Sequence, residues 1–188
     1  MCALVIPVIT ARRLTGLEPA TVTSDVVVQD PDQTFNPNDG FSNLHQFNLS
    51  GAAFFRIAMP PESVADPAID LDIFVYNPNG VQVASSTSGA TNELVDIALP
   101  MDGTWSVFVH GWQTAGPSAD YDMYSWIVSA TPGGNMTIDS APASATIGTH
   151  AIDVSWTGAT AGQWHLGAVS HTGDSGLMGL TLVNVDNR

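Results

Sequence analysis

Apolar and polar residues alternate along most of this chain, and the alternating runs are bounded by Gly, Pro, Asn and Asp. A period of two puts apolar side chains on one face of a β-strand, whereas a helix needs them three or four positions apart. Helical spacing never extends beyond a turn or two. We therefore predict thirteen strands, over residues 4–14, 21–28, 45–49, 52–58, 71–77, 81–85, 92–99, 103–111, 121–130, 136–138, 151–156, 164–171 and 176–186.

Short strands at near-regular spacing predict an all-β fold, because sandwiches and barrels have this pattern. The turn sequences N-P-N-G at residues 77–80 and P-M-D-G at residues 100–103 favour tight hairpins. The sequence T-P-G-G at residues 131–134 interrupts the alternation and marks a domain boundary. We expect an antiparallel β-sandwich or jelly-roll-like domain, followed by a smaller β-sandwich-like segment.

The expected domains are residues 26–131 for the larger sandwich and residues 135–188 for the smaller one. Residues 1–25 then form a strand and a linker from a truncated upstream domain, and this strand packs with the C-terminal segment. The apolar N-terminus could also be read as a signal peptide. Its arginines, Arg12 and Arg13, follow the apolar stretch, whereas a signal peptide has its positive charges before it. We therefore favour the strand.

Charge excludes several functions. The chain has 18 acidic residues, four arginines and no lysine, for a net charge of −14. Nucleic acids and anionic membranes need basic surfaces, so neither is an expected partner.

No apolar run reaches the 18 residues of a membrane-spanning helix. The single cysteine excludes an internal disulfide and a thiolate zinc site. Fifteen of the acids are Asp set among Asn, Ser, Thr and Gly, which favours binding of a hard cation.

Four segments carry a family resemblance: A-A-F-F-R-I-A at 52–58, D-L-D-I-F-V-Y-N-P-N-G at 70–80, E-L-V-D-I-A-L-P at 93–100 and G-T-W-S-V-F-V-H-G-W at 103–112. In order and spacing they resemble the bacterial pre-peptidase C-terminal (PPC) domain, which has a D-L-D-x-x-V strand, an N-P-x-G turn and a G-T-aromatic-x-V-x-V strand. The flanking segments at 16–20, 30–37, 110–114, 124–126, 154–158, 166–170 and 180–185 are similar to tails of large secreted bacterial subtilisin-like serine proteases.

The resemblance implies a secreted, extracellular protein whose partners are an upstream protease catalytic domain and a polymeric protein substrate. It further implies an accessory role in stability, maturation or substrate binding. A free-standing adhesin or a carbohydrate- or collagen-binding module is the alternative, because the same sandwich architecture serves lectins. Genomic sequence upstream of this chain would distinguish the two.

No catalytic motif is visible in the sequence. Subtilisin-like catalysis needs a His in an H-G-T setting and a Ser in G-T-S-M, and neither is present. The nucleophile elbow G-x-S-x-G and the zinc motif H-E-x-x-H are absent as well. We therefore expect this chain not to be an enzyme, while the resemblance makes the parent protein a serine endopeptidase.

Two carboxylates in the segment D-L-D form a candidate metal site. Asp70 and Asp72 are two positions apart on a predicted strand, so both point away from the face that carries Leu71 and Ile73. Adjacent like charges are unfavourable and must be compensated. Calcium would do this, with its shell completed by Asp66, Asp120, Asp122 or backbone carbonyls. Alternatively, one Asp accepts backbone N–H bonds from a loop and the other is solvated.

The segment over residues 30–39 is also rich in oxygen ligands, but its Asp and Asn residues fail the spacing of an EF-hand loop. Asp and Asn are frequent in solvated turns, where their side chains hydrogen-bond the nearby backbone. We therefore favour a solvated loop here over a metal site.

The strand over residues 103–111 and the residue after it offer a candidate binding surface. Alternation puts Trp105, Val107 and Val109 on one face, and Phe108, His110 and Trp112 on the other. Both faces are thus apolar or aromatic. Either the strand is buried between two layers, or the face with Phe108, His110 and Trp112 is exposed as a substrate-binding platform for a polypeptide or polysaccharide.

Overall fold

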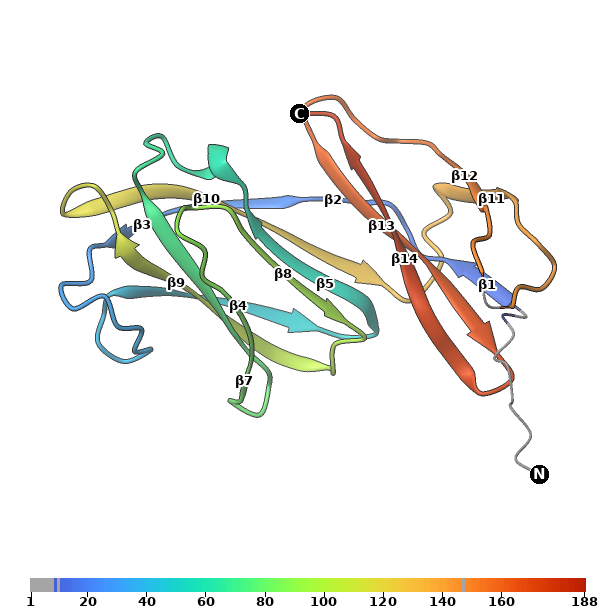
Figure 1. Cartoon of the computed structure of the whole chain (residues 1–188), viewed down its shortest axis with the longest axis horizontal. Coiled ribbons are helices and arrows are strands. Elements are labelled where there is room, and N and C mark those ends of the chain that lie inside the picture. The colour runs from blue at the N-terminus through green and yellow to red at the C-terminus, as the bar shows by residue number, and fades with distance from the viewer. Residues whose placement is uncertain (1–8, 10, 147) are drawn as a thin grey trace. The chain divides into compact units, whose positions relative to one another are not determined.

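The computed structural model describes residues 9, 11–146 and 148–188, which are almost all strand and turn (Figure 1). The strands are β1 (Ala11–Leu14), β2 (Glu18–Pro19), β3 (Thr21–Val28), β4 (Ser42–Leu49), β5 (Ala52–Met59), β6 (Asp70–Tyr76), β7 (Gln82–Ser86), β8 (Glu93–Ala98), β9 (Gly103–Gln113), β10 (Ser118–Ser129), β11 (Met136–Ser140), β12 (Asp153–Trp156), β13 (Trp164–Gly173) and β14 (Gly176–Asp186). A 3-10 turn, η1 (Pro61–Ser63), is the one helical element within these residues. The predicted all-β fold is confirmed.

Two compact units divide the described chain. The central unit is Thr21–Ile127, and the flanking unit combines the described residues up to Ala20 with Val128–Arg188. The central unit begins before the expected boundary at residue 26, because all of β3 pairs with β10. Of the strand expected over residues 4–14, the part from Ala11 onward is β1, and residues 1–8 and 10 lie outside the described residues.

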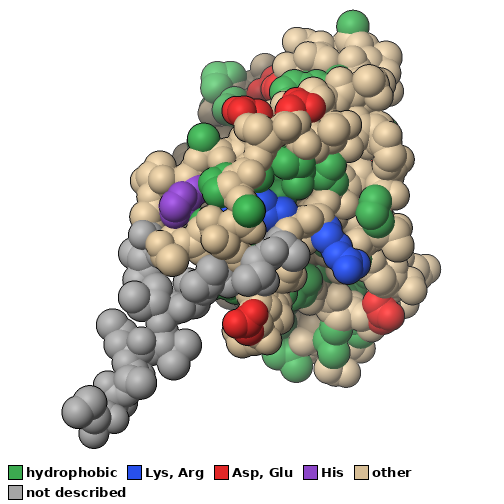
Figure 2. Space-filling view, turned by 90° about the vertical axis from the view of Figure 1, so that its right-hand side faces the viewer, with side chains coloured by type: hydrophobic (Ala, Val, Ile, Leu, Met, Phe, Trp, Pro, Cys, Tyr) green, Lys and Arg blue, Asp and Glu red, His purple; other side chains and the backbone are tan. Residues whose placement is uncertain are grey.

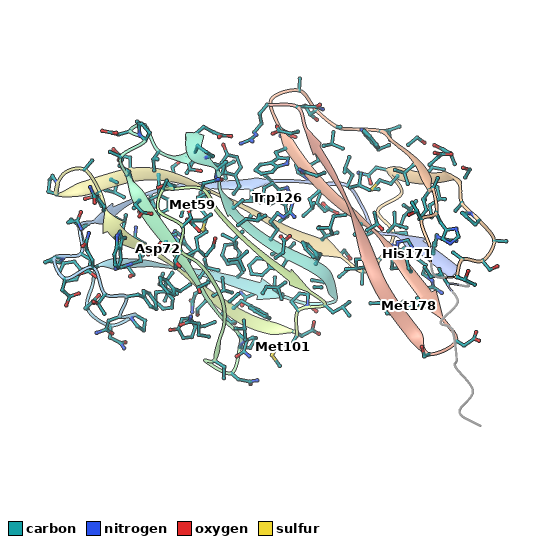
Figure 3. All side chains as sticks on the ribbon, viewed as in Figure 1. Met59, Asp72, Met101, Trp126, His171 and Met178 are labelled. Atoms are coloured by element: carbon teal, nitrogen blue, oxygen red, sulfur yellow. The ribbon has the colours of Figure 1, made fainter. Side chains whose placement is uncertain are left out.

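The central unit is an antiparallel β-sandwich. One sheet has the order β3-β10-β5-β8 and the other the order β4-β9-β6-β7. A single apolar core draws on both sheets, and its side chains fill the space between them (Figure 3). It includes Val27, Phe55, Ile57, Met59, Leu71, Ile73, Val75, Trp105, Val107, Val109 and Met123. The inward face of β6 (Leu71, Ile73 and Val75) is fully buried, as its alternation predicts.

The flanking unit contains a sheet of order β1-β13-β14, in which β2 also pairs with β13. β13 and β14 form a long antiparallel hairpin, and β11 and β12 form a separate two-stranded sheet. β1 pairs with β13 over Ala11–Leu14, so the N-terminal strand belongs to the same sheet as the C-terminal hairpin.

The surface carries few charged side chains. On the face drawn in Figure 2, a few acidic and basic groups stand among side chains that are mostly uncharged. This agrees with a sequence in which 12% of residues are charged. No helix in the described part of the chain is long and apolar enough to cross a membrane.

A histidine joins the two sheets of the sandwich. Nε2 of His45 in β4 lies 2.7 Å from the hydroxyl of Tyr121 in β10. Asn43 donates to the same hydroxyl and to the backbone of β3, which places this cross-link at one edge of the core. Burial lowers the pKa of His45, and the carboxylate of Asp25, 3.8 Å away, opposes this only in part.

We expect His45 to make the protein less stable in acid. Its folded-state pKa lies below its unfolded value of about 6.5, so the neutral form stabilises the fold above that pH, and this contribution is lost as the pH falls below it. In His45→Gln, the decrease in unfolding free energy from about pH 7.5 to about pH 5.5 should be smaller than in the wild type. Urea denaturation at both pH values measures the difference, and equal decreases in the two proteins would contradict the assignment.

Candidate functional site

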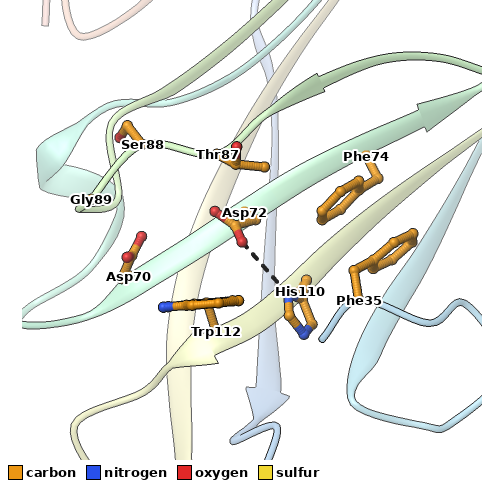
Figure 4. Close-up of a pocket in the computed structure, with 9 residues that line it drawn as sticks. All are labelled: Phe35, Asp70, Asp72, Phe74, Thr87, Ser88, Gly89, His110 and Trp112. Carbon is orange, nitrogen blue, oxygen red and sulfur yellow. Dashed lines mark ion pairs between the residues drawn. The ribbon is translucent and has the colours of Figure 1, made fainter. Parts of the chain in front are cut away.

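A pocket of about 470 Å³ lies on the outer face of the sheet that contains β6 and β9 (Figure 4). It is lined by Phe35, Asp70, Asp72, Phe74, Thr87, Ser88, Gly89, His110 and Trp112. The structure thus brings together four of the six candidates from the sequence: the Asp70 and Asp72 pair, and the His110 and Trp112 pair. Their common location follows from the pairing of β6 with β9.

A β-bulge sets the directions of the side chains at this pocket. Asp72 of β6 lies opposite His110 of β9, but Asp70 lies opposite Gln113, so β9 has an extra residue in this interval. Bulges of this kind re-aim side chains and are frequent near functional sites. Here His110 stays fully buried, whereas Trp112 is 37% exposed. The bulge therefore separates a buried polar group from an accessible aromatic ring.

His110 is held between two carboxylates. Its Nε2 lies 2.7 Å from Oδ2 of Asp30, and its Nδ1 lies 3.6 Å from Oδ2 of Asp72, which is an ion-pair distance but too long for a hydrogen bond. Burial lowers the pKa of His110, but Asp72 and Asp30 together raise it above the ordinary value. Asp30 is therefore the closest charged partner of this buried ring.

Asp30 is the buried exception in the segment over residues 30–39, which is otherwise mostly exposed, as predicted for a solvated loop. Its side chain is 1% exposed, because the segment folds back over β9 and places the carboxylate against His110. Burial alone would raise the pKa of Asp30, but the bond from His110 and the backbone N–H groups of Asp32 and Thr34 lower it overall. The segment also supplies Phe35 to the pocket, stacked on Phe74 with ring centroids 3.7 Å apart.

A third carboxylate joins Asp70 and Asp72. Glu93, the first residue of β8, is 1% exposed, and one oxygen from each of these three side chains lies within 4.8 Å of the others. Burial, followed by repulsion from Asp72 and Glu93, raises the pKa of Asp70 to about 6. The three carboxylates therefore concentrate negative charge in a mostly buried position.

Asp66 is not in this group, although the sequence suggested it as a ligand. Its Oδ1 accepts a hydrogen bond from the backbone N–H of Ala68, 2.9 Å away, so it closes its own turn before β6. Sequence reasoning missed Glu93 instead. A signal was present, because Glu93 occupies the same face of β8 as the buried Val95, and an acid at a core-facing position needs a compensating partner.

Phe108 lies apart from the pocket. It lines a separate hollow with Tyr76, and the two rings meet edge to face with centroids 5.5 Å apart. The opposite face of β9, with Trp105 and Val109, is buried in the core. The face of β9 for which burial and an exposed platform are the two alternatives is therefore divided: Phe108 is half-buried, His110 is buried, and Trp112 is the accessible aromatic ring.

His110 is not positioned to act as a base toward Ser88, which also lines the pocket. Both ring nitrogens of His110 face carboxylates, so neither is placed to accept the proton of Ser88. The Ser88 hydroxyl lies 2.6 Å from Oε1 of Glu93 and 2.7 Å from the carbonyl of Ala90. In Figure 4 the indole of Trp112 is seen edge-on near Asp70, where a ligand could contact the ring and a carboxylate together.

No protein-family model and no curated protein matches the chain. A solved structure with some similarity is the crystal structure of the Bacillus licheniformis lipase BlEst2 in its propeptide form, with a TM-score of 0.35 and 10% sequence identity. The match covers 98% of this chain and 41% of that one, so this chain spans less than half the length of that protein.

Proposed function

We propose that this chain is a non-catalytic accessory segment of a secreted subtilisin-like serine protease and that it binds a polymeric protein substrate. The observation that carries the binding role is Trp112, an aromatic residue that is 37% exposed at the mouth of a pocket. Exposed aromatic rings in pockets are frequent anchors of protein partners. The parent protease and the secreted location are supported by the sequence resemblance over residues 52–112.

The chemistry of the pocket favours a polypeptide that carries basic groups. Trp112 offers an aromatic face, and Asp70 and Asp72 offer negative charge close to it. A cation over an indole ring is stabilised by the ring quadrupole, and carboxylates add to this attraction. The net charge of −14 acts in the same direction over longer distances. We therefore expect a substrate with Lys or Arg side chains to bind more tightly than an acidic one.

Trp112→Ala tests the proposal. We expect at least about a tenfold loss of affinity for insoluble collagen, because removal of a central aromatic anchor has effects of this size. Trp156→Ala is the matched control, because Trp156 is 42% exposed but lies in β12 of the flanking unit. Co-sedimentation measures the bound fraction, and circular dichroism verifies that both variants are folded. An unchanged bound fraction in Trp112→Ala would exclude this ring from binding.

A free-standing carbohydrate-binding module is the second candidate. Trp112 supports it as well, because an exposed indole flanked by the polar residues Thr87 and Ser88 can also stack on a sugar ring. Binding to chitin and cellulose in the same sedimentation experiment identifies a carbohydrate-binding module, whereas binding to collagen alone is expected both of the accessory segment and of a collagen-binding module. The reading frame upstream distinguishes them independently: an in-frame subtilisin-like catalytic domain supports the accessory segment, and a signal peptide directly before this region contradicts it.

A further inference from the structure

Two buried carboxylates and one half-buried carboxylate converge at one edge of the sandwich. Glu93 and Asp72 are 1% and 5% exposed, and Asp70 is partly accessible from the pocket. Glu93 comes from β8 in one sheet, and the two aspartates come from β6 in the other. The buried Thr91 holds these segments together, because its hydroxyl accepts from the N–H of Leu71 and donates to the carbonyl of Ile69. The convergence is therefore a fixed feature of the fold.

One oxygen of Glu93 is a separate indication of a ligand. Oε1 accepts both hydrogen bonds from Ser88, from its backbone N–H at 2.9 Å and its hydroxyl at 2.6 Å. Oε2 is buried and has no hydrogen-bond partner among the described residues, and the same holds for Oδ1 of Asp70. Buried carboxylate oxygens are strongly unfavourable unless a donor or a cation compensates them.

The basic side chains nearest to the three carboxylates make their closest contacts with other acidic residues. His110 is the basic group beside Asp72, and its closer contact, at 2.7 Å, is to Asp30. Arg56 is in the same unit, but its guanidinium makes two bonds to Asp96, at 2.6 and 2.7 Å. His110 lies between Asp30 and Asp72 and can neutralise at most one of them, so among the described residues the carboxylates of Asp30, Asp70, Asp72 and Glu93 carry more negative charge than this side chain can balance.

We propose that Asp70, Asp72 and Glu93 bind one calcium ion at the end of β6 and the start of β8. Calcium binds hard oxygen ligands at about 2.3–2.6 Å, so oxygens on opposite sides of the ion are about 4.6–5.2 Å apart. The three carboxylate oxygens, all within 4.8 Å of one another, fit this span. The side of Asp70 that opens to the pocket leaves room for water to complete the shell. The site does not require the parent protease, but it uses Asp70 and Asp72, so a bound calcium ion would take up the negative charge proposed above to attract basic side chains.

The ion would connect the two sheets and fix a wall of the pocket. Glu93 holds Ser88 through two hydrogen bonds, and Ser88 and Gly89 line the pocket opposite β9. A cation that fixes the carboxylate of Glu93 therefore also fixes the segment over residues 87–89. Calcium is then expected to stabilise the central unit and to order the pocket that contains Trp112.

Thermal melts with and without calcium test the site. After chelation, 10 mM CaCl₂ should raise the unfolding midpoint of the wild type by about 5 °C or more, as expected for a site with Kd of about 0.1–1 mM. Glu93→Gln should lose most of this shift, because it removes the charge but keeps an acceptor for Ser88. Asp66→Asn is the matched control: it removes the same charge, keeps the turn acceptor and should retain the full shift.

The calcium-free melts separate metal binding from a structural role. Without calcium, Glu93→Gln should be at least as stable as the wild type, because it relieves repulsion among buried carboxylates. A Glu93→Gln variant destabilised equally with and without calcium would overturn the proposal. Equal calcium shifts in Glu93→Gln and Asp66→Asn would also overturn it, because the effect would then be general screening of the net charge.

Terbium luminescence locates the site, because Trp112 lines the same pocket and can transfer excitation to a bound Tb³⁺ ion. Luminescence should appear in the wild type, decrease when CaCl₂ competes, and be lost in Trp112→Phe, while Trp112→Phe keeps its calcium-dependent melting shift. An equal melting shift with MgCl₂ would overturn the assignment to calcium. A shift with arginine amide but none with CaCl₂ would overturn the metal site in favour of a site for basic side chains.

Discussion

Replacement of Asp30 by alanine is expected to lower the free energy of unfolding by about 3–5 kcal/mol. Asp30 and His110 are each 1% exposed and lie 2.7 Å apart, so removal of the carboxylate leaves a buried imidazole without its main charge partner. The backbone N–H of Asp32 loses its side-chain acceptor at the same time, and that of Thr34 keeps only the carboxylate of Asp32. Breaking one side of a buried, hydrogen-bonded pair is among the most destabilising single changes in a protein.

Chemical denaturation of Asp30→Ala and Asp32→Ala measures this effect. Asp32 is exposed and also accepts from the N–H of Thr34, but it has no buried partner, so its removal should cost less than about 1 kcal/mol. The comparison separates the buried pair from the loop turn that both residues share. Equal losses in the two variants would show that the pair with His110 contributes nothing measurable.

The second large effect is expected at Gly111, in the bulge of β9. A Cβ at this position would lie 2.1 Å from the backbone carbonyl oxygen of Val28, well inside van der Waals contact. Backbone atoms of paired segments cannot move away easily, because the Gly111 N–H donates to the carbonyl of Phe41 and its own carbonyl accepts from the N–H of Asp30. Gly111→Ala should therefore destabilise the protein by about 3 kcal/mol or more.

Gly89→Ala is the matched control, because a Cβ there meets no atom within 4 Å and the residue has no positive φ. It should change the free energy of unfolding by less than about 1 kcal/mol in either direction. Soluble yield and urea midpoints of the two variants give the comparison. If Gly111→Ala is as stable as Gly89→Ala, β3 and β9 are not as close as the structure places them.

Local patterns predicted much of the fold. The alternation in β6 placed Leu71 and Ile73 in the core and Asp70 and Asp72 on the opposite face, because the direction of a side chain on a strand depends only on its position. The same rule placed Trp105 inward on β9. These predictions need no knowledge of which strands pair, and the structure agrees with them.

Predictions that depended on distant partners were less successful. Glu93 joins the aspartates because β8 and β6, in different sheets, come close at one edge of the sandwich. Asp30 is buried because a loop folds back onto β9, 80 positions away in the sequence. Asp and Asn in a loop indicate solvated turns in general, and only the tertiary fold shows which of them is covered.

The flanking unit consists of two separate segments of the chain, one before and one after the central unit. Thr21 lies opposite Ser125, so the two ends of the central unit meet across the β3 and β10 pair. The central unit therefore has its entry and exit side by side. A short linker from Ala20 to Val128 could replace it, and the sandwich could be transferred to another host loop as one cassette.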